Sequence, residues 1–261
     1  MSGQIRYDVA DGVATITLDR PESKNAFTVE MVDAWADVVH HARTDSQVGA
    51  LVLTGAGEAF CAGGDLGLIG SSDSSALAAK RVLSEHIHRV ALAMDELDKP
   101  AIAAVNGVAV GAGMDMALMC DLRFMARSAR MSEGYIRLGL VPGDGGAYYL
   151  PRIVGVAKAL DLLWTGEFVD ADEALRIGLV SRICDDDTVL ADAQAFAAKL
   201  AAGPPVAIRM IKREVYQALR SDLRTSLDLI SSHMGIAAMT EDAHEAQRAM
   251  RERRVAEFTD R

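Results

Sequence analysis

The sequence predicts an α/β protein with a core of largely parallel strands, followed by a helical last third. Segments with the alternating apolar pattern of a strand are repeatedly followed by segments with the longer apolar period of a helix. This order is typical of parallel sheets with right-handed crossovers. After "GLVSRI" only helical patterns follow. With 50% hydrophobic and 25% charged residues among 261, we expect one large globular domain with a helical appendage.

The chain is expected to open with a β-hairpin. "IRYDV" and "VATITLD" alternate on either side of Asp11-Gly12, a dipeptide that favours a tight turn between antiparallel strands. A helix is expected over residues 28–43, where Thr28 is suited to cap the first turn. "ALVLTG" then predicts a buried strand.

The same alternation continues through the middle of the chain. It predicts a helix near residues 75–97, a strand at "AIAAV", a short helix from about Gly111 and a strand at "DLRFMA". The last third is expected to form a helical layer or an oligomerisation element. Its helical patterns are "DTVLADAQAFAAKLAAG", "PVAIRMIKREVYQAL", "LRTSLDLISSHMGIAAM" and "DAHEAQRAMRER".

Composition excludes several classes of function. A formal net charge of −10 argues against general binding of nucleic acid or anionic membranes, which requires clustered Lys and Arg. The three cysteines are widely spaced without a CxxC pair, so neither a disulfide framework nor a zinc site is expected. The N-terminus lacks the pattern of a secretory signal, and no segment approaches the ~18 apolar residues of a membrane span. We therefore expect a cytoplasmic protein.

Two glycine-rich turns are the first candidates for chemistry. "CAGGDL" and "NGVAVGAG" each follow a predicted strand, where α/β sheets usually place ligands, but neither completes a dinucleotide fingerprint or a phosphate loop. Two backbone N–H groups converging there could form an oxyanion hole. The alternative is that the glycines only permit tight turns.

These motifs belong to a longer series of blocks, by which the chain is identified as a member of the crotonase superfamily, also called the enoyl-CoA hydratase/isomerase family. The resemblance runs nearly end to end. Its blocks are "VATITLDRPESKNAF", "ALVLTGAGEAFCAGGDL", "KPAIAAVNGVAVGAGMDMALMCDLRFMA", "LGLVPGDGGAYYLPRIVG", "EALRIGLVSRI" and "MRERRVAEF".

The resemblance implies a crotonase-like fold and an activity on acyl-CoA thioesters, as in fatty-acid or related metabolism. The fold is a ββα spiral core, expected over residues 1–195. A C-terminal helical trimerisation region is expected over residues 196–261, with assembly as a homotrimer or a dimer of trimers. No separate cofactor or metal is implied, because coenzyme A enters as part of the substrate.

The resemblance also implies roles for particular residues. The oxyanion donors fall on the backbone N–H groups of Gly64 and Ala112, the latter at a position where relatives usually carry glycine. The residues expected along coenzyme A, the last two of them from a neighbouring subunit, are Lys24, Ala26, Ala62, Asp65, Leu66, Met250 and Arg253.

The expected catalytic positions depart from the hydratase pattern. Where hydratases of the family carry two Glu that hold and activate water, this chain has Asp115 and Tyr135. Asp115 is either an acid or base beside the thioester or a complement to the dipole of its helix. With a reference pKa of about 10, Tyr135 is expected to be a protonated donor rather than a base, or else a pocket-lining aromatic.

Other polar side chains near these positions are weaker candidates. Asp144 in "PGDGG" is a third possible catalytic acid, since relatives with other activities recruit an acid near this loop, or it caps the helix that follows. Glu133 is expected in a solvated loop, and His86 and His88 are expected at the surface of the helix that covers the acyl pocket.

Three functions remain open from the sequence. The first is an enoyl-CoA hydratase or close relative that uses Asp115 with help from Tyr135 or Asp144. The second is another crotonase reaction, such as isomerisation, hydrolysis or decarboxylation, through an enolate held by the same N–H groups. The third is a catalytically silent acyl-CoA carrier or sensor, suggested by the replaced Glu pair.

Overall fold

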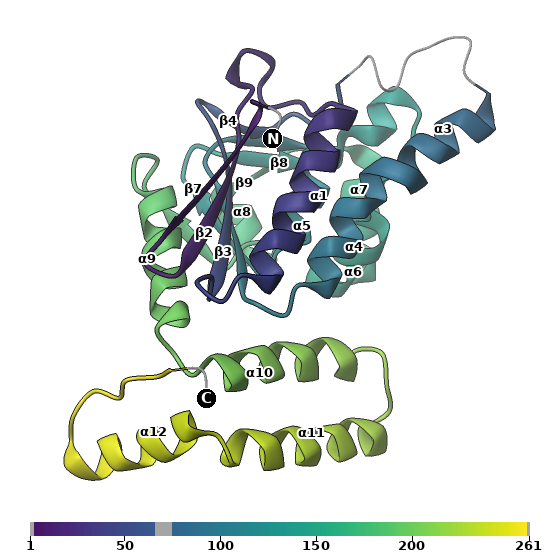
Figure 1. Ribbon diagram of the computed structural model, residues 1–261. Coiled ribbons are helices and arrows are strands. Elements are labelled where there is room, and N and C mark those ends of the chain that lie inside the picture. The colour runs from purple at the N-terminus through teal and green to yellow at the C-terminus, as the bar shows by residue number, and fades with distance from the viewer. Residues whose placement is uncertain (1–2, 66–74, 260–261) are drawn as a thin grey trace.

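The chain folds into a core of two β-sheets wrapped by helices, with a separate layer of helices at the C-terminus (Figure 1). The structure is a computed structural model and describes residues 3–65 and 75–259. It confirms the α/β class and the helical last third, since no described strand follows Cys184.

The larger sheet is parallel except at one edge. Its order is β1-β2-β3-β5-β7-β10, and only β1 pairs antiparallel. Asp11 and Gly12 both have positive φ, 51° and 75°, which confirms the predicted hairpin turn. The strands are β1 (Ile5–Ala10), β2 (Val13–Leu18), β3 (Ala50–Gly55), β5 (Ala101–Val105), β7 (Leu122–Ala126) and β10 (Arg182–Cys184).

The smaller sheet has the order β4-β6-β8-β9 and was not predicted, because strands of two or three residues are too short to show an alternating pattern. Each strand pair β3–β4, β5–β6 and β7–β8 gives its first member to the larger sheet and its second to the smaller one. This repetition produces the expected ββα spiral. The short strands are β4 (Ala59–Cys61), β6 (Val108–Val110), β8 (Arg130–Ser132) and β9 (Val169–Asp170).

The helices of the core confirm the predicted positions. Thr28 caps α1 (Val29–Thr44) by accepting a hydrogen bond from the Met31 N–H. The helix expected near residues 75–97 consists of α3 (Ala76–Val82), the π-helical turn η2 (Leu83–Ile87) and α4 (His88–Glu96). The remaining helical elements of the core are η1 (Pro21–Ser23), α5 (Ala112–Leu118), η3 (Gly134–Leu138), α6 (Gly146–Val154), α7 (Val156–Thr165) and α8 (Ala171–Arg176).

Helix α9 (Val189–Ala201) covers the face of the larger sheet opposite to α1 (Figure 1). Its Gln194 side chain donates a hydrogen bond to the Thr15 hydroxyl on β2, and its Phe196 ring packs 5.6 Å from that of Phe124 on β7. The division expected between residues 195 and 196 falls inside this helix and stays a prediction.

The C-terminal layer contains α10 (Pro205–Ala218), α11 (Leu223–Ala238) and α12 (Glu241–Glu252). Asp121, which precedes β7, ties α10 to the core by accepting hydrogen bonds from Lys212 and Tyr216, both 2.8 Å long. Among the residues that the structure describes, no helix combines the length and apolar character needed to cross a membrane.

A buried asparagine joins the loops that lie beside the site. Asn25, with a φ of 57°, is fully buried, and its amide donates to the carbonyls of Ala56 and Ala59. Its side-chain oxygen accepts from the Arg20 N–H. The loop of residues 20–27 is therefore held against the start of β4, next to the first glycine-rich turn.

Candidate active site

Asp115 is held in place by the close approach of α5 to β4. The helix begins after Gly111, whose φ of 53° turns the chain away from β6. A Cβ atom at Gly113 would lie 2.1 Å from the Cys61 carbonyl oxygen, so only glycine permits this packing. Asp115 lies in the first turn, as predicted, and is completely buried.

The structure brings the three predicted catalytic side chains together. The Tyr135 hydroxyl, on η3, lies 2.8 Å from Oδ2 of Asp115 and 2.5 Å from Oδ2 of Asp144. A hydroxyl carries one hydrogen and can donate to only one of these oxygens at a time. The second contact therefore requires a proton on one of the two carboxyl groups.

Asp144 faces this cluster instead of capping a helix. The N-cap of α6 is Gly145, and no side chain makes a capping hydrogen bond there, so the cap interpretation of Asp144 is wrong. The Asp144 carboxyl is buried, and its Oδ1 has no hydrogen-bond partner among the described residues.

Glu133 is a fourth member of the cluster, and its expected position in a solvated loop was wrong. It is 1% exposed, and its two oxygens receive no N–H or O–H donor from the described residues. Its carboxyl meets that of Asp115 at Gly146, and the interaction between the two groups shifts the pKa of each. No alternating pattern signals this burial, because Met131, Ser132 and Glu133 are buried in succession.

The N-terminus of α6 closes the cluster from another side. A Cβ atom at Gly146 would lie 2.3 Å from Oδ1 of Asp115 and 2.9 Å from Oε1 of Glu133. The missing side chain therefore makes room for both carboxyl groups. His88 on α4, expected at the surface, is half-buried, with Nε2 2.8 Å from the Gly143 carbonyl, next to Asp144.

Burial dominates the electrostatics of these groups. It raises the pKa of Asp115 to about 7, although hydrogen bonds from Tyr135 and Glu133 act in the opposite direction. Burial and then the negative charge of Asp115 raise the pKa of Glu133 to about 10. Burial also raises the pKa values of Asp144 and Tyr135. At neutral pH Tyr135 and Glu133 thus keep their protons, while Asp115 can exchange one.

The two glycine-rich turns meet beside this cluster. Phe27 donates to the Gly63 carbonyl and accepts from the Asp65 N–H, so this bridge does not use the N–H of Gly64. A Cβ atom at Gly63 would lie 3.6 Å from the Ala112 nitrogen, the first residue of α5. The N–H groups predicted as oxyanion donors therefore belong to adjoining backbone segments.

Residues predicted along coenzyme A also form adjoining segments. The Ala62 N–H donates to the Lys24 carbonyl over 2.9 Å. The Arg20 guanidinium, at 2.7 Å each, donates to the Ala26 carbonyl and to the Asp65 carboxylate. The loops of residues 24–26 and 62–65 are thus held side by side.

The other predicted coenzyme A contacts are Leu66, Met250 and Arg253. Leu66 lies outside the described residues. Met250 and Arg253 are exposed at the end of α12, in the C-terminal layer (Figure 1). Their predicted role as contacts from a neighbouring subunit stays a prediction.

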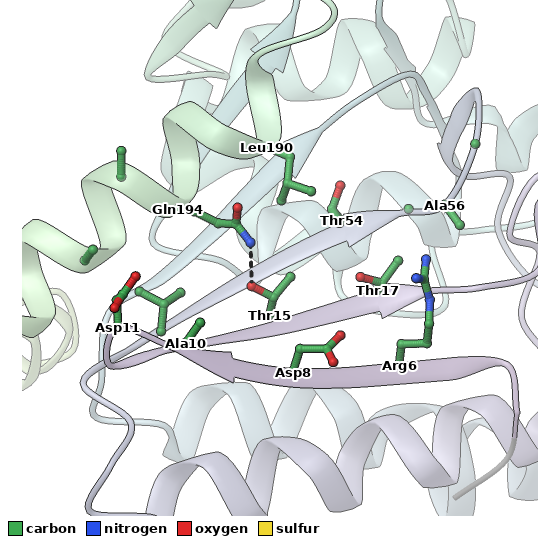
Figure 2. Close-up of a pocket in the computed structure, with 15 residues that line it drawn as sticks. Arg6, Asp8, Ala10, Asp11, Thr15, Thr17, Thr54, Ala56, Leu190 and Gln194 are labelled. Carbon is green, nitrogen blue, oxygen red and sulfur yellow. Dashed lines mark hydrogen bonds between the residues drawn. The ribbon is translucent and has the colours of Figure 1, made fainter.

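A hollow of about 570 Å³ lies elsewhere, between the larger sheet and α9. Figure 2 shows that its lining includes Arg6 and Asp8 on β1, Thr15 and Thr17 on β2, and Gln194 on α9. None of the predicted site residues lines this hollow, and Gln194 is already bonded to Thr15. The candidate active site is therefore the acid cluster.

A metal centre finds no support in the part of the chain that the structure describes. No group of three or more His, Cys, Asp or Glu side chains there has an arrangement that could hold an ion. Cys61, Cys120 and Cys184 are buried free thiols, and burial raises the pKa of each. Thiolates, the form that binds zinc, are thus disfavoured.

Comparisons with known proteins match the chain over nearly its whole length. A family model described as enoyl-CoA hydratase/isomerase matches residues 8–261. The chain is 35% identical over 246 residues to a short-chain-enoyl-CoA hydratase of Clostridium acetobutylicum, covering 94% of this chain and 93% of that protein. It is 36% identical over 256 residues to the 1,2-epoxyphenylacetyl-CoA isomerase of Escherichia coli, covering 96% of both.

Solved structures agree with these relatives. An enoyl-CoA hydratase from Bacillus anthracis superimposes with a TM-score of 0.93 at 30% identity, covering 99% of this chain and 100% of that one. The spiral core is thus that of a crotonase-fold protein. The chain belongs to the enoyl-CoA hydratase/isomerase family.

The raised pKa of Asp115 predicts a pH dependence of stability. Between the ordinary Asp pKa of about 4 and about 7, the folded protein binds a proton that the unfolded chain has released. The contribution of Asp115 to stability is therefore complete below about pH 4 and is lost as the pH rises to about 7. Asp115→Asn removes this loss, so we expect its free energy of unfolding, relative to the unchanged protein, to increase over this range.

Urea denaturation at several pH values measures this difference. Asp187→Asn, at an exposed position, controls for the removal of one carboxyl group from the chain. A difference between Asp115→Asn and the unchanged protein that stays constant from about pH 4 to about pH 7 contradicts the prediction.

Proposed function

We propose that this protein transforms acyl-CoA thioesters by acid–base catalysis through an enolate. Asp115 moves the proton, and the N–H groups of Gly64 and Ala112 hold the enolate oxygen. The observation that carries this proposal is the Tyr135 hydroxyl between Asp115 and Asp144, because it supports a buried carboxyl group whose pKa is about 7. A group with such a pKa can accept and return a proton at neutral pH.

The names of relatives support the substrate class, since the hydratase and the isomerase described above are both named for CoA thioesters. The loops of residues 24–26 and 62–65, which hydrogen bonds hold side by side, are the proposed contacts for coenzyme A. The enolate is common to the reactions of this class, because a thioester carbonyl can take the electron pair released when its neighbouring carbon loses a proton.

The reaction that this geometry supports best is the shift of a double bond along the acyl chain. The Asp115 carboxylate takes a proton from carbon, and the electron pair moves to the thioester oxygen. The electron pair of the enolate then returns to the carbon at the far end of the conjugated system. This carbon receives the proton back from the Asp115 carboxyl. Tyr135 keeps its own proton throughout, because burial and two neighbouring carboxyl groups raise its pKa.

Hydration of an enoyl-CoA is the second candidate and is supported by the hydratases among the relatives. In this reaction a carboxylate takes a proton from water, whose oxygen attacks the double bond. Two groups must hold that water between them. Here the Tyr135 hydroxyl contacts both Asp115 and Asp144 directly, and these contacts favour proton transfer to carbon over a water held between the side chains.

Product identification tests the proposed function. The protein is incubated with a panel of enoyl-CoA thioesters that differ in chain length and double-bond position, and products are analysed by chromatography and mass spectrometry. We expect a product of unchanged mass and altered retention. Addition of one water identifies hydration instead. Binding of acyl-CoA without any product identifies a silent carrier and contradicts the proposal.

Asp115→Asn tests the role of the carboxylate. The change keeps shape and polarity but removes proton transfer, so turnover should fall by roughly 100-fold or more while acyl-CoA affinity, measured by calorimetry, changes little. Tyr135→Phe should cause a smaller loss because it removes a donor and not the base. If turnover stays nearly intact in Asp115→Asn and falls strongly in Asp144→Asn, the proton transfer is assigned to Asp144 instead.

We also infer that the chain assembles as a homotrimer or a dimer of trimers. The C-terminal layer presents a broad apolar surface in the single chain, which is typical of a subunit interface. Exposed apolar side chains on its helices include Ile211, Val215, Leu219, Leu223, Leu227, Met234, Ile236 and Met250.

Light scattering at micromolar protein measures the assembly. We expect a mass three or six times that of the 27.8 kDa chain. A monomer contradicts this inference and also the predicted contribution of Arg253 to a neighbouring coenzyme A site. The cytoplasmic location expected from the sequence is tested separately, by fractionation of the source cells.

A further inference from the structure

We propose that Glu133 is a positioning residue of the site, which keeps its proton and donates it to Oδ1 of Asp115. The inference rests on the proposed function in one respect, namely that Asp115 moves the proton in the reaction. Glu133 itself does not exchange its proton in turnover. It fixes the orientation of the Asp115 carboxyl and stabilises its charged form.

Besides the Gly146 N–H, which acts on the Asp115 carboxyl, a proton between Glu133 and Asp115 is the interaction that satisfies both groups. Glu133 is 1% exposed, and neither of its oxygens receives an N–H or O–H donor within the described residues. Oδ1 of Asp115 is equally buried and also lacks such a donor. Both groups meet at Gly146, where a Cβ atom would lie 2.3 Å from Oδ1 of Asp115 and 2.9 Å from Oε1 of Glu133, so a proton on one of them supplies the missing bond.

The neighbours decide which carboxyl group keeps this proton. Asp115 has a second donor, the Tyr135 hydroxyl on Oδ2, which favours its carboxylate form. Glu133 has no donor of this kind, and burial, Asp115 and Asp144 all favour its protonated form. The proton therefore resides on Glu133, and the charge on Asp115.

The number of hydrogens that the contacts of the cluster require shows that the proton on Glu133 is distinct from the proton that Asp115 exchanges. The Tyr135 hydroxyl contacts Asp115 and Asp144, so these three groups need one carboxyl proton in addition to the hydroxyl hydrogen. The contact between Glu133 and Asp115 needs another. The cluster thus holds one proton that exchanges and one that Glu133 retains, because burial and the charge of Asp115 raise the pKa of Glu133.

The pKa of Asp115 depends on groups from each of the elements that pack around it. Tyr135 comes from η3, Glu133 from the end of β8, and Asp144 from the loop before α6, whose Gly146 N–H also favours the carboxylate. His88 on α4 acts on Asp144. A useful variant must therefore change the donor at residue 133 alone.

Two variants separate the donor from the acid. Glu133→Gln keeps the length and an N–H donor but has no ionisable proton, whereas Glu133→Met has a similar length and no donor. Glu167→Gln makes the same chemical change at an exposed position and is the matched control. Circular dichroism and thermal unfolding confirm that each variant folds before it is compared.

The pH profile of turnover is the first readout. We expect the acidic limb of kcat in Glu133→Gln to stay within about 0.3 pH unit of the unchanged protein. In Glu133→Met the limb should move up by about one unit, with a roughly tenfold loss of kcat near pH 7, because the Asp115 carboxylate loses a donor. If the acidic limb of the kcat profile moves down by a unit in Glu133→Gln, Glu133 is charged in the unchanged protein. If the limb does not move in Glu133→Met, Glu133 does not act on Asp115. Either result overturns the inference.

Infrared spectroscopy of the protein without substrate is the second readout. The C=O stretching band of a protonated carboxyl group is distinct from that of a carboxylate. We expect this band in the unchanged protein and in Glu167→Gln at about pH 8, and its loss in Glu133→Gln. An identical spectrum in Glu133→Gln overturns the inference. Because this measurement needs no turnover, absence of any reaction refutes the proposed function without deciding the state of Glu133.

Discussion

The hydroxyl of Tyr135 lies between two buried carboxyl groups, and the charge of the site depends on its contacts with them. It donates its one hydrogen to one of them and accepts from the other when that group is protonated. The hydroxyl lies 2.8 Å from Asp115 and 2.5 Å from Asp144. Burial disfavours the charge on any carboxyl group, but this donor offsets part of that effect. Glu133 has no such donor, and burial together with the negative charge of Asp115 raises its pKa further from the ordinary value than that of Asp115.

This arrangement depends on two glycines as much as on the acids. Gly113 lets α5 approach β4 until the missing Cβ would lie 2.1 Å from a carbonyl oxygen, and Gly146 lets α6 approach both Asp115 and Glu133. A methyl group at either position would separate the elements that carry the acids. The backbone packing of the ββα spiral thus brings the carboxyl groups together and buries them, and burial is the main cause of their raised pKa values.

Much of the fold could be predicted from local patterns, whereas the burial of the acids could not. The Asp11-Gly12 turn and the Thr28 cap follow from neighbouring residues, so sequence analysis located them. The strands of the smaller sheet are too short to show a period. Glu133 and Asp144 were misjudged or left open because their environment comes from α5, η3 and α6, which meet only in the folded chain. A hydrophilic residue next to a glycine has the same local pattern whether it is solvated or enclosed.

The division between backbone and side-chain chemistry explains how this site can depart from the hydratase pattern and keep the proposed enolate chemistry. The oxyanion donors are N–H groups, so an alanine at residue 112 donates as a glycine does, and the turn that aims it is supplied by Gly111. The acids are side chains, and their replacement by Asp115 and Tyr135 alters which atom gains or loses a proton. Relatives named as hydratase and as isomerase match this chain over nearly its whole length at similar identity. On the proposed function, the spiral core therefore stabilises one intermediate, and the protonation of the enclosed carboxyl cluster selects the reaction that follows from it.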